Sequence, residues 1–282
     1  MSQVKRYTGQ KAVQLVADIG GHVEGAAVIL LHGGGQTRHS WRGAFDALVA
    51  AGYHVISYDA RGHGESGWSP DGDYTLPVLA ADLQAIIDTL ETPPTLVGAS
   101  MGAATAFYLA GATRSAGIGA LVMVDLVPRV EQAGADRILA FMRAYPEGFA
   151  TVEEAADAVC EYYPHRPRPR DPSGLMKNLR RGENGRLYWH WDPKMLEQDD
   201  RPEPPPSLAD RMSSVKDGIS VPVMLIRGTR SDIVSDAGVA EFRQMLPQLE
   251  VVDVSGAGHM VVGDSNDAFN SGLLDFLARN RL

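Results

Sequence analysis

The chain has 282 residues, of which 44% are hydrophobic, a composition typical of one soluble globular unit with a full core. Its formal net charge of −9 argues against a nucleic-acid partner, because binding phosphates requires a basic face. The single cysteine, Cys160, excludes an internal disulfide and favours a reducing compartment. We find neither a secretory signal nor a run of about 18 apolar residues, so we expect a cytoplasmic protein with no membrane partner. The sequence indicates no oligomeric state.

Short apolar runs alternate with helical patterns in the first part of the chain. Four runs are typical of buried strands: residues 26–31, 54–58, 95–98 and 120–125. Three segments have helical patterns: residues 41–51, 79–90 and 101–112. Strands that alternate with helices predict parallel βαβ units, with both faces of the sheet covered.

The pattern changes after Pro128. Residues 129–216 contain helical stretches at 132–144 and 152–162, separated by proline clusters, and no convincing strand. The alternation then resumes with a strand at 221–226, a helix at 236–246, a strand at 250–254 and a last helix whose apolar face carries Phe269, Leu273, Phe276 and Leu277. We therefore predict a core made of residues 1–128 and 217–282, interrupted by a helical cap at residues 129–216.

Residues 98–102 read Gly-Ala-Ser-Met-Gly, the G-x-S-x-G pattern. A strand precedes this pentapeptide and a helix of small residues follows it, which is the context that a nucleophile elbow requires. Ser100 would then stand at the carboxyl edge of the sheet, where the N-terminus of the next helix favours developing negative charge. The alternative is a glycine-rich turn with an incidental serine, and the motifs below argue against it.

A serine needs a base to become nucleophilic, and the base needs a carboxylate to orient it. His259 directly follows the last predicted strand, so it should lie at the same sheet edge as Ser100. Asp232 follows the strand at 221–226 and is our predicted acid. Asp125, at the end of the strand at 120–125, is the rival; followed by Leu-Val-Pro, it is expected to organise the exit of the chain into the cap.

Acyl transfer also needs donors for an oxyanion. We predict that they are the backbone N–H groups of Met101, next to the nucleophile, and of Gly34 in the sequence His-Gly-Gly-Gly, with Gly35 as the alternative. Among the other histidines, His63 lies in a turn and is expected to be structural. His190 lies in the cap and would reach the site only from above.

Five segments stand in an order that resembles the α/β-hydrolase superfamily: LLHGGG (30–35), YDARGHGES (58–66), VGASMG (97–102), RGTRSDIV (227–234) and GAGHMV (256–261). The order serine, aspartate, histidine is also that of the superfamily. The chain looks most similar to the branch of small esterases, cofactor-free haloperoxidases (perhydrolases), carbon–carbon bond hydrolases and epoxide hydrolases. The resemblance implies a mostly parallel eight-stranded sheet with flanking helices and a cap inserted after strand six. It also implies that the turn at 59–66 is structural.

The serine narrows the chemistry within that branch. Epoxide hydrolases and haloalkane dehalogenases there use aspartate at the elbow, so Ser100 argues against both. We expect a serine hydrolase that acts on a small ester, lactone or related acyl substrate through an acyl-enzyme, with no cofactor and no metal ion. The open alternatives are a carbon–carbon bond hydrolase or a perhydrolase on the same triad, and a receptor-like ligand-binding or lyase member of the fold.

The aromatic residues suggest where substrate binds. Residues 188–191 read Tyr-Trp-His-Trp, the densest aromatic cluster of the chain, and we predict that Trp189 helps to roof an apolar pocket. Trp41, soon after the glycine loop, is the predicted floor of that pocket. The alternative for both is packing between elements.

Overall fold

The computed structural model describes residues 2–164, 168–197, 206–259, 261 and 266–280. An eight-stranded sheet forms the centre of this part of the chain. Its strands, in spatial order, are β1 (Gln3–Thr8), β2 (Gln14–Gly20), β4 (His54–Tyr58), β3 (Ala27–Leu31), β5 (Thr95–Ala99), β6 (Ala120–Val124), β9 (Val223–Gly228) and β10 (Leu249–Val254). The pairings β1–β2 and β2–β4 are antiparallel, and the others are parallel. The expected mostly parallel eight-stranded sheet is confirmed.

The composition of the strands accounts for their positions. Every residue of β3, β4 and β6 is buried, as expected for strands covered on both faces. The sequence did not reveal β1 and β2 in this way. In β1 only Tyr7 is buried, so this edge strand has no apolar run that would mark it in the sequence.

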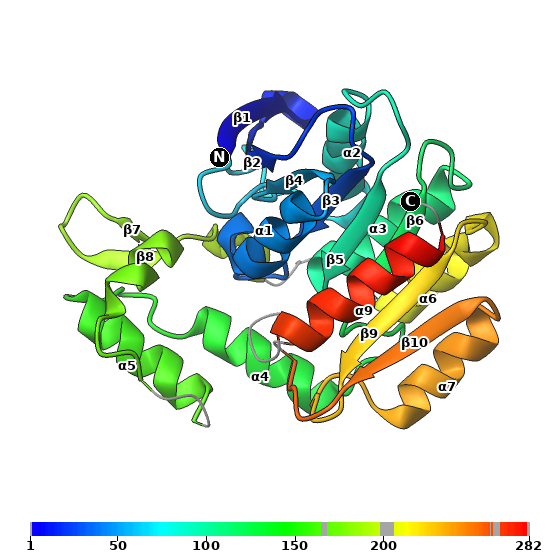
Figure 1. Ribbon diagram of the computed structural model, residues 1–282. Helices are drawn as coiled ribbons and strands as arrows, with labels where there is room; N and C mark the ends of the chain where they lie inside the picture. Colours follow the sequence, from blue (N-terminus) through cyan, green and yellow to red (C-terminus); the bar gives the residue numbers. More distant parts are fainter. Residues whose placement is uncertain (1, 165–167, 198–205, 260, 262–265, 281–282) are drawn as a thin grey trace.

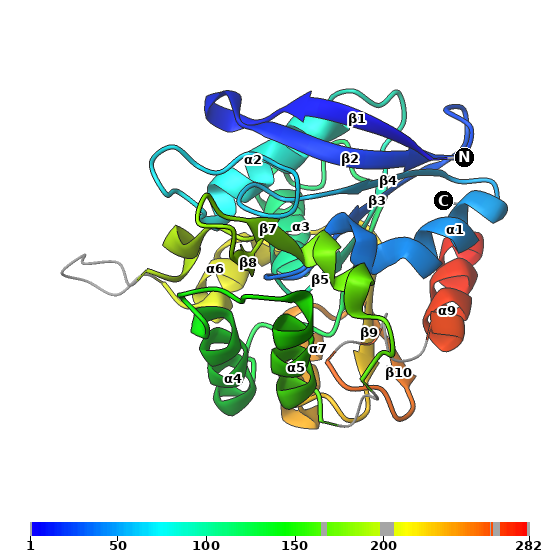
Figure 2. The same ribbon diagram turned by 90° about the vertical axis from the view of Figure 1, so that its left-hand side faces the viewer.

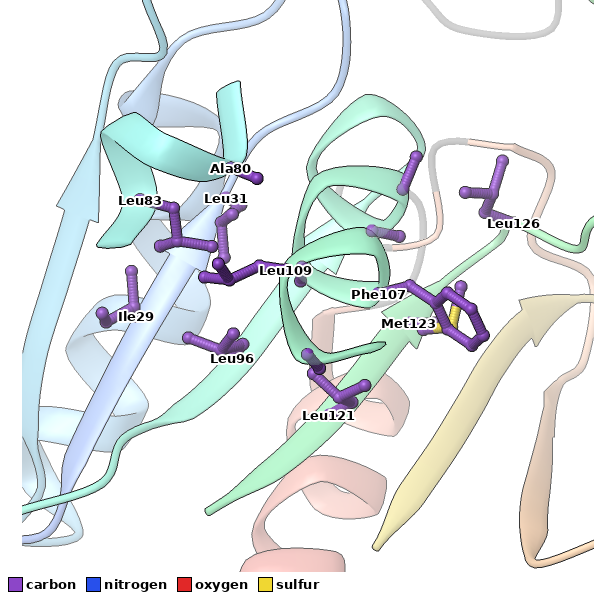
Figure 3. Packing of buried hydrophobic residues seen from close by; sticks show 14 of the residues in the cluster. Ile29, Leu31, Ala80, Leu83, Leu96, Phe107, Leu109, Leu121, Met123 and Leu126 are labelled. Atoms are coloured by element: carbon purple, nitrogen blue, oxygen red, sulfur yellow. The ribbon is translucent and has the colours of Figure 1, made fainter. Parts of the chain in front are cut away.

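Helices cover the two faces of the sheet (Figures 1 and 2). One face packs against α1 (Arg42–Ala50) and α9 (Asn266–Arg279). The other packs against α2 (Leu76–Ile87), α3 (Met101–Ala112), α6 (Leu208–Val215) and α7 (Asp236–Met245). Figure 3 shows this second face, where Leu83 of α2 and Leu109 of α3 pack against Ile29, Leu96 and Leu121 of the strands. The four apolar residues predicted for the last helix are all at most 1% exposed.

The chain between β6 and β9 carries α4 (Gln132–Arg143), α5 (Val152–Tyr162), β7 (Leu179–Arg181), β8 (Leu187–Trp189) and then α6. Short 3-10 turns occur at Gln10–Ala12, Arg38–Trp41, Pro172–Asn178, Pro193–Leu196 and Lys216–Gly218. β7 and β8 pair in an antiparallel hairpin, so the prediction of a cap without strands was wrong. Three-residue strands are too short to show an alternating pattern, and tertiary contacts such as the bond from the Phe149 N–H to the Leu187 carbonyl (2.6 Å) stabilise this one.

The cap helices α4 and α5 stand beyond the end of the sheet toward which β9 points, which is the carboxyl end of the parallel strands (Figure 1). The first cap residues are tied to the core, since the Glu131 N–H donates to the Ile233 carbonyl at 2.9 Å. α6 behaves differently. It packs against α3, and its Met212 is fully buried in the core cluster. No helix in the described ranges is long and apolar enough to cross a membrane.

Candidate active site

Ser100 joins β5 to α3 in a strained backbone conformation. Its φ of 47° and ψ of −112° are rare for a residue with a side chain. Glycines on both sides make the turn sterically feasible, since a Cβ on Gly102 would lie 2.4 Å from the Leu31 carbonyl oxygen and one on Gly98 would lie 2.5 Å from the Gly102 oxygen. This is the geometry of a nucleophile elbow, in which the side chain of Ser100 faces a cavity at the sheet edge.

The imidazole of His259 lies in the loop after β10 and faces the same cavity. Its Nδ1 lies 2.7 Å from Oδ2 of Asp125, a carboxylate that is only 1% exposed. Asp232 makes no such contact, because its carboxylate pairs with Arg137 of α4 at 2.6 Å. The predicted pairing of His259 with Asp232 is therefore wrong, and the rival residue, Asp125, takes this place.

The backbone around Asp125 explains the difference. The N–H of Asp125 donates to the Ile226 carbonyl at 2.8 Å, which extends the β6–β9 pairing by one residue. Its Oδ1 accepts the Gly228 N–H at 3.1 Å, and its Oδ2 accepts the Ser231 hydroxyl at 2.5 Å. The Ser231 hydroxyl in turn accepts the N–H of Val234 at 3.1 Å. This turn directs the next residue, Asp232, toward the cap rather than toward His259.

The glycine loop after β3 lies against Ser100, since a Cβ on Gly33 would be 3.5 Å from the Ser100 Cβ. The N–H of Gly33 donates to Gln36 Oε1 at 3.2 Å, and that of Gly35 donates to His63 Nε2 at 3.1 Å. In the described part of the chain, the N–H of Gly34 has no hydrogen-bond partner. The N–H of Met101, the first residue of α3, has no helical partner either. Both N–H groups are thus available at the wall of the cavity.

The cavity has a volume of about 530 Å³, and both the cap and the core line it. Most of its walls are apolar side chains: Leu126, Val130, Ile138, Leu139, Phe141, Met142, Val159, Leu175, Trp189, Trp191, Leu208 and Ile233. Among the described lining residues there is no Asp, Glu, Lys or Arg. The cavity therefore offers hydrogen-bonding groups near Ser100 and a mainly apolar, uncharged surface elsewhere.

The two predicted substrate-binding tryptophans differ in position. Trp189 lines the cavity and stacks on Trp191, with 5.2 Å between ring centroids. Trp41 is 1% exposed and does not line the cavity; it packs on Phe269 of α9, with 5.9 Å between centroids. The prediction that Trp41 forms the pocket floor was wrong. Its proximity to the glycine loop in the sequence did not reveal that Trp41 packs on the face of the sheet that α1 and α9 cover.

Three buried histidines surround the glycine loop. His32 Nδ1 lies 2.8 Å from the Gly33 carbonyl and its Nε2 accepts the Ala60 N–H. His63 Nδ1 lies 3.1 Å from the Arg61 carbonyl, and its Nε2 accepts the N–H of Gly35. The third, His190, accepts the Gly64 N–H at Nδ1, and its Nε2 lies 3.3 Å from the Gly35 carbonyl. Because each ring accepts a backbone N–H at one nitrogen, each must be neutral, with its proton on the other nitrogen.

Burial keeps these rings neutral. It lowers the pKa of His32 to about 4. It lowers the pKa of His63 to about 3, with a further contribution from His32, and that of His190 to about 3, with a further contribution from His63. Although three histidines lie together, no group of His, Cys, Asp and Glu in the described ranges is placed to hold a metal ion.

The turn at residues 59–66 has the structural role that was expected. The Arg61 guanidinium binds the buried Asp82 carboxylate at 2.6 and 2.7 Å, and Asp59 pairs with the buried Arg38. The Ser66 hydroxyl donates to the Asp59 carbonyl at 2.6 Å. None of these groups lines the cavity.

The lowered histidine pKa values predict that the fold is sensitive to acid. The unfolded state binds protons near pH 6.5, whereas the folded state binds them only near pH 3–4. The stability that the three neutral histidines contribute is therefore fully present above about pH 6.5 and is lost as the pH falls below that value. Replacing His63 with Gln removes one such group. It should lower the slope of unfolding free energy against pH between pH 6 and 4.5, by up to about 1.4 kcal/mol per pH unit.

Urea unfolding at a series of pH values measures this slope for wild type and H63Q. Carboxylates titrate in both proteins, so their contribution cancels in the comparison. The same slope in both proteins would contradict a neutral His63 in the folded state.

Comparisons with known proteins indicate one fold family. The family model described as "alpha/beta hydrolase fold" matches residues 26–265. The esterase Rv0045c of Mycobacterium tuberculosis is 31% identical over 245 residues, which cover 84% of this chain and 78% of the relative. The sn-1-specific diacylglycerol lipase ABHD11 of Mus musculus is 28% identical over 266 residues, which cover 89% and 81% of the two chains.

The crystal structure of E-2-(acetamidomethylene)succinate hydrolase superposes with a TM-score of 0.83, covering 99% of this chain and all of the other. Its sequence identity is 22%, so this likeness is one of fold. The family model covers most of the chain, and the elbow, the glycine loop and the histidine after the last strand have the positions that the fold prescribes. The chain therefore belongs to the α/β-hydrolase family.

Proposed function

We propose that this α/β-hydrolase is a serine esterase that cleaves carboxylic esters with an uncharged, apolar acyl group. Ser100 is the nucleophile, His259 the general base and Asp125 the carboxylate that orients His259. The observation that carries the proposal is the 2.7 Å contact between His259 and the buried Asp125, at a cavity that Ser100 also lines. The esterase and lipase activities named for the relatives support an ester as the substrate.

The first half of the reaction forms an acyl-enzyme. His259 Nε2 accepts the Ser100 proton while Oγ attacks the ester carbonyl carbon. The negative charge on the carbonyl oxygen is stabilised by hydrogen bonds from the N–H groups of Gly34 and Met101. The tetrahedral intermediate then collapses, the alcohol leaves with the proton that His259 returns, and the acyl group stays on Ser100.

The second half releases the acid. His259 removes a proton from water, which attacks the acyl carbonyl, and the same two N–H groups bind the new oxyanion. Collapse of this intermediate returns the proton to Ser100 Oγ. Asp125 accepts the Nδ1–H of His259 throughout, which keeps Nε2 facing the reaction and stabilises the imidazolium.

The lining supports the choice of acyl group. An ionised group that loses water in an apolar site costs several kcal/mol unless a partner of opposite charge is present. Since the described lining residues include no Lys or Arg, an anionic acyl chain would have no such partner. Aliphatic chains, by contrast, gain about 0.8 kcal/mol per buried CH₂ group.

Removing the nucleophile tests the reaction class. The S100A variant should lose at least about 10³-fold in kcat on p-nitrophenyl butyrate, because no acyl-enzyme can form. A fluorophosphonate probe should label the wild type at Ser100, as located by peptide mass spectrometry, and should leave S100A unlabelled. A wild type that neither hydrolyses esters nor reacts with the probe would instead favour a ligand-binding role.

Substitutions of the two aspartates should differ in their effect on kcat. D125N should lower kcat by about 10³-fold or more, because the amide can present its NH₂ to His259 and favour the wrong tautomer. D232N removes only the partly exposed ion pair with Arg137, so kcat should change by less than about fivefold. Steady-state kinetics on one ester, with circular dichroism to verify folding, measure both. A larger loss in D232N than in D125N would reverse the assignment of the acid.

A panel of p-nitrophenyl esters tests the substrate class. Hexanoate should be hydrolysed with a kcat/KM at least about 100-fold above that of the adipate monoester, which differs by a terminal carboxylate. W189A should shift the preferred acyl chain toward longer members, because it removes a ring from the cavity wall. W68A is the matched control, since Trp68 is 38% exposed and does not line the cavity. The same chain-length preference in W189A and W68A would exclude Trp189 from the acyl site.

A further inference from the structure

His190 is a cap residue that contacts two parts of the core. It follows β8 directly and is 3% exposed. Its Nδ1 accepts the N–H of Gly64 at 2.7 Å, and its Nε2 lies 3.3 Å from the carbonyl oxygen of Gly35. The ring therefore joins the cap, the turn at residues 59–66 and the glycine loop. The triad chemistry uses none of these contacts.

The glycine loop has three successive peptide planes, and each of them binds a different imidazole. The plane between Gly33 and Gly34 contains the Gly33 carbonyl, which accepts from His32 at 2.8 Å, and also the Gly34 N–H. The next plane contains the Gly35 N–H, which donates to His63 at 3.1 Å. The third contains the Gly35 carbonyl, which accepts from His190, and the Gln36 N–H, which donates to the Gly33 carbonyl at 3.1 Å and so links this plane to the one that contains the Gly34 N–H. Because a peptide is planar, each ring fixes the orientation of the N–H and C=O groups in its plane.

Glycines need such external constraint. Without side chains they have many backbone conformations of similar energy, and Gly35 occupies one with φ of 72°. An oxyanion donor contributes fully only when it already points at the position of the developing charge. We propose that His190 is a positioning residue for the oxyanion hole, which makes the orientation of the Gly34 N–H depend on the docked cap. The inference rests on the proposed function of Gly34.

The contacts around Gly35 indicate what loss of His190 would do. Removing the imidazole leaves the Gly64 N–H and the Gly35 carbonyl without this partner at half-buried positions. Trp191 lies over Gly35, since a Cβ there would be 3.4 Å from its ring, so water has little access from that side. The loop should therefore shift toward other partners, and the Gly34 N–H should lose its orientation.

Variants at position 190 separate positioning from packing. H190F keeps a ring of similar size without either hydrogen bond. H190N retains an acceptor near Gly64, but its shorter side chain cannot reach Gly35. H190Q supplies both an acceptor and a donor at reach. F149L is the control for general cap damage, because Phe149 is buried in the cap cluster, 2% exposed, and does not line the active-site cavity.

Steady-state kinetics on a p-nitrophenyl ester give the first readout. H190F and H190N should lower kcat by about 10- to 100-fold with little change in KM, because the oxyanion bond strengthens only in the transition state. H190Q should recover most of the activity. F149L should lower the melting temperature without the fall in kcat. A kcat in H190F and H190N that matches that of F149L would overturn the proposal, and H190N answers the question if H190F does not fold.

Backbone amide shifts give a second readout that needs no catalysis. In ¹⁵N-labelled protein without substrate, the Gly34 and Gly35 resonances should move in H190N and return toward wild-type positions in H190Q. If the wild type hydrolyses no ester but these resonances move, the proposed function fails and the positioning role stands. If esters are hydrolysed and neither kcat nor the resonances change in H190N, the positioning role fails.

Discussion

The carboxylate of Asp125 is the interaction on which the geometry of the site depends. It accepts the Gly228 N–H at the end of β9, the Ser231 hydroxyl in the next turn and Nδ1 of His259 after β10. Three segments that are distant in sequence thus meet at one buried carboxylate. The direction of the Ser100 side chain depends in the same way on the strained turn between β5 and α3. The proposed base is therefore positioned by the sheet ends rather than by the loop that carries it.

The sequence was sufficient to predict features that depend on a local pattern of residues. Apolar runs identified the six mutually parallel strands, and the glycines around Ser100 identified the elbow, because both express a local steric or burial requirement. The acid could not be chosen in this way. Asp125 and Asp232 both follow strands, and which of them faces His259 depends on the turn that Ser231 organises. For Trp41 the prediction rested on its proximity to the glycine loop, and the sequence contains no information on which face of the sheet the helix covers.

The histidines show why a polar group can be conspicuous in a sequence and still have no part in proton transfer. His32, His63 and His190 lie close to the cavity, yet each ring is committed to one backbone donor and one backbone acceptor. Protonating such a ring would remove its acceptor and leave a buried N–H unpaired, so burial and hydrogen bonding both favour the neutral form. An imidazole has a donor and an acceptor at a fixed separation. It therefore suits a loop of three glycines, which offers only backbone N–H and C=O groups for binding.

The position of α4 and α5 beyond the strand ends has a consequence for how this protein can change. The reacting groups come from the sheet edge, whereas much of the apolar wall comes from the cap. Substitutions at wall positions such as Leu139 or Val159 can therefore reshape the space for a ligand while the bond-breaking residues keep their places. His190 is the exception, because it lies in the cap but contacts Gly64 and Gly35 of the core. A lineage that exchanges its cap for a new specificity must retain this imidazole or find another support for the loop.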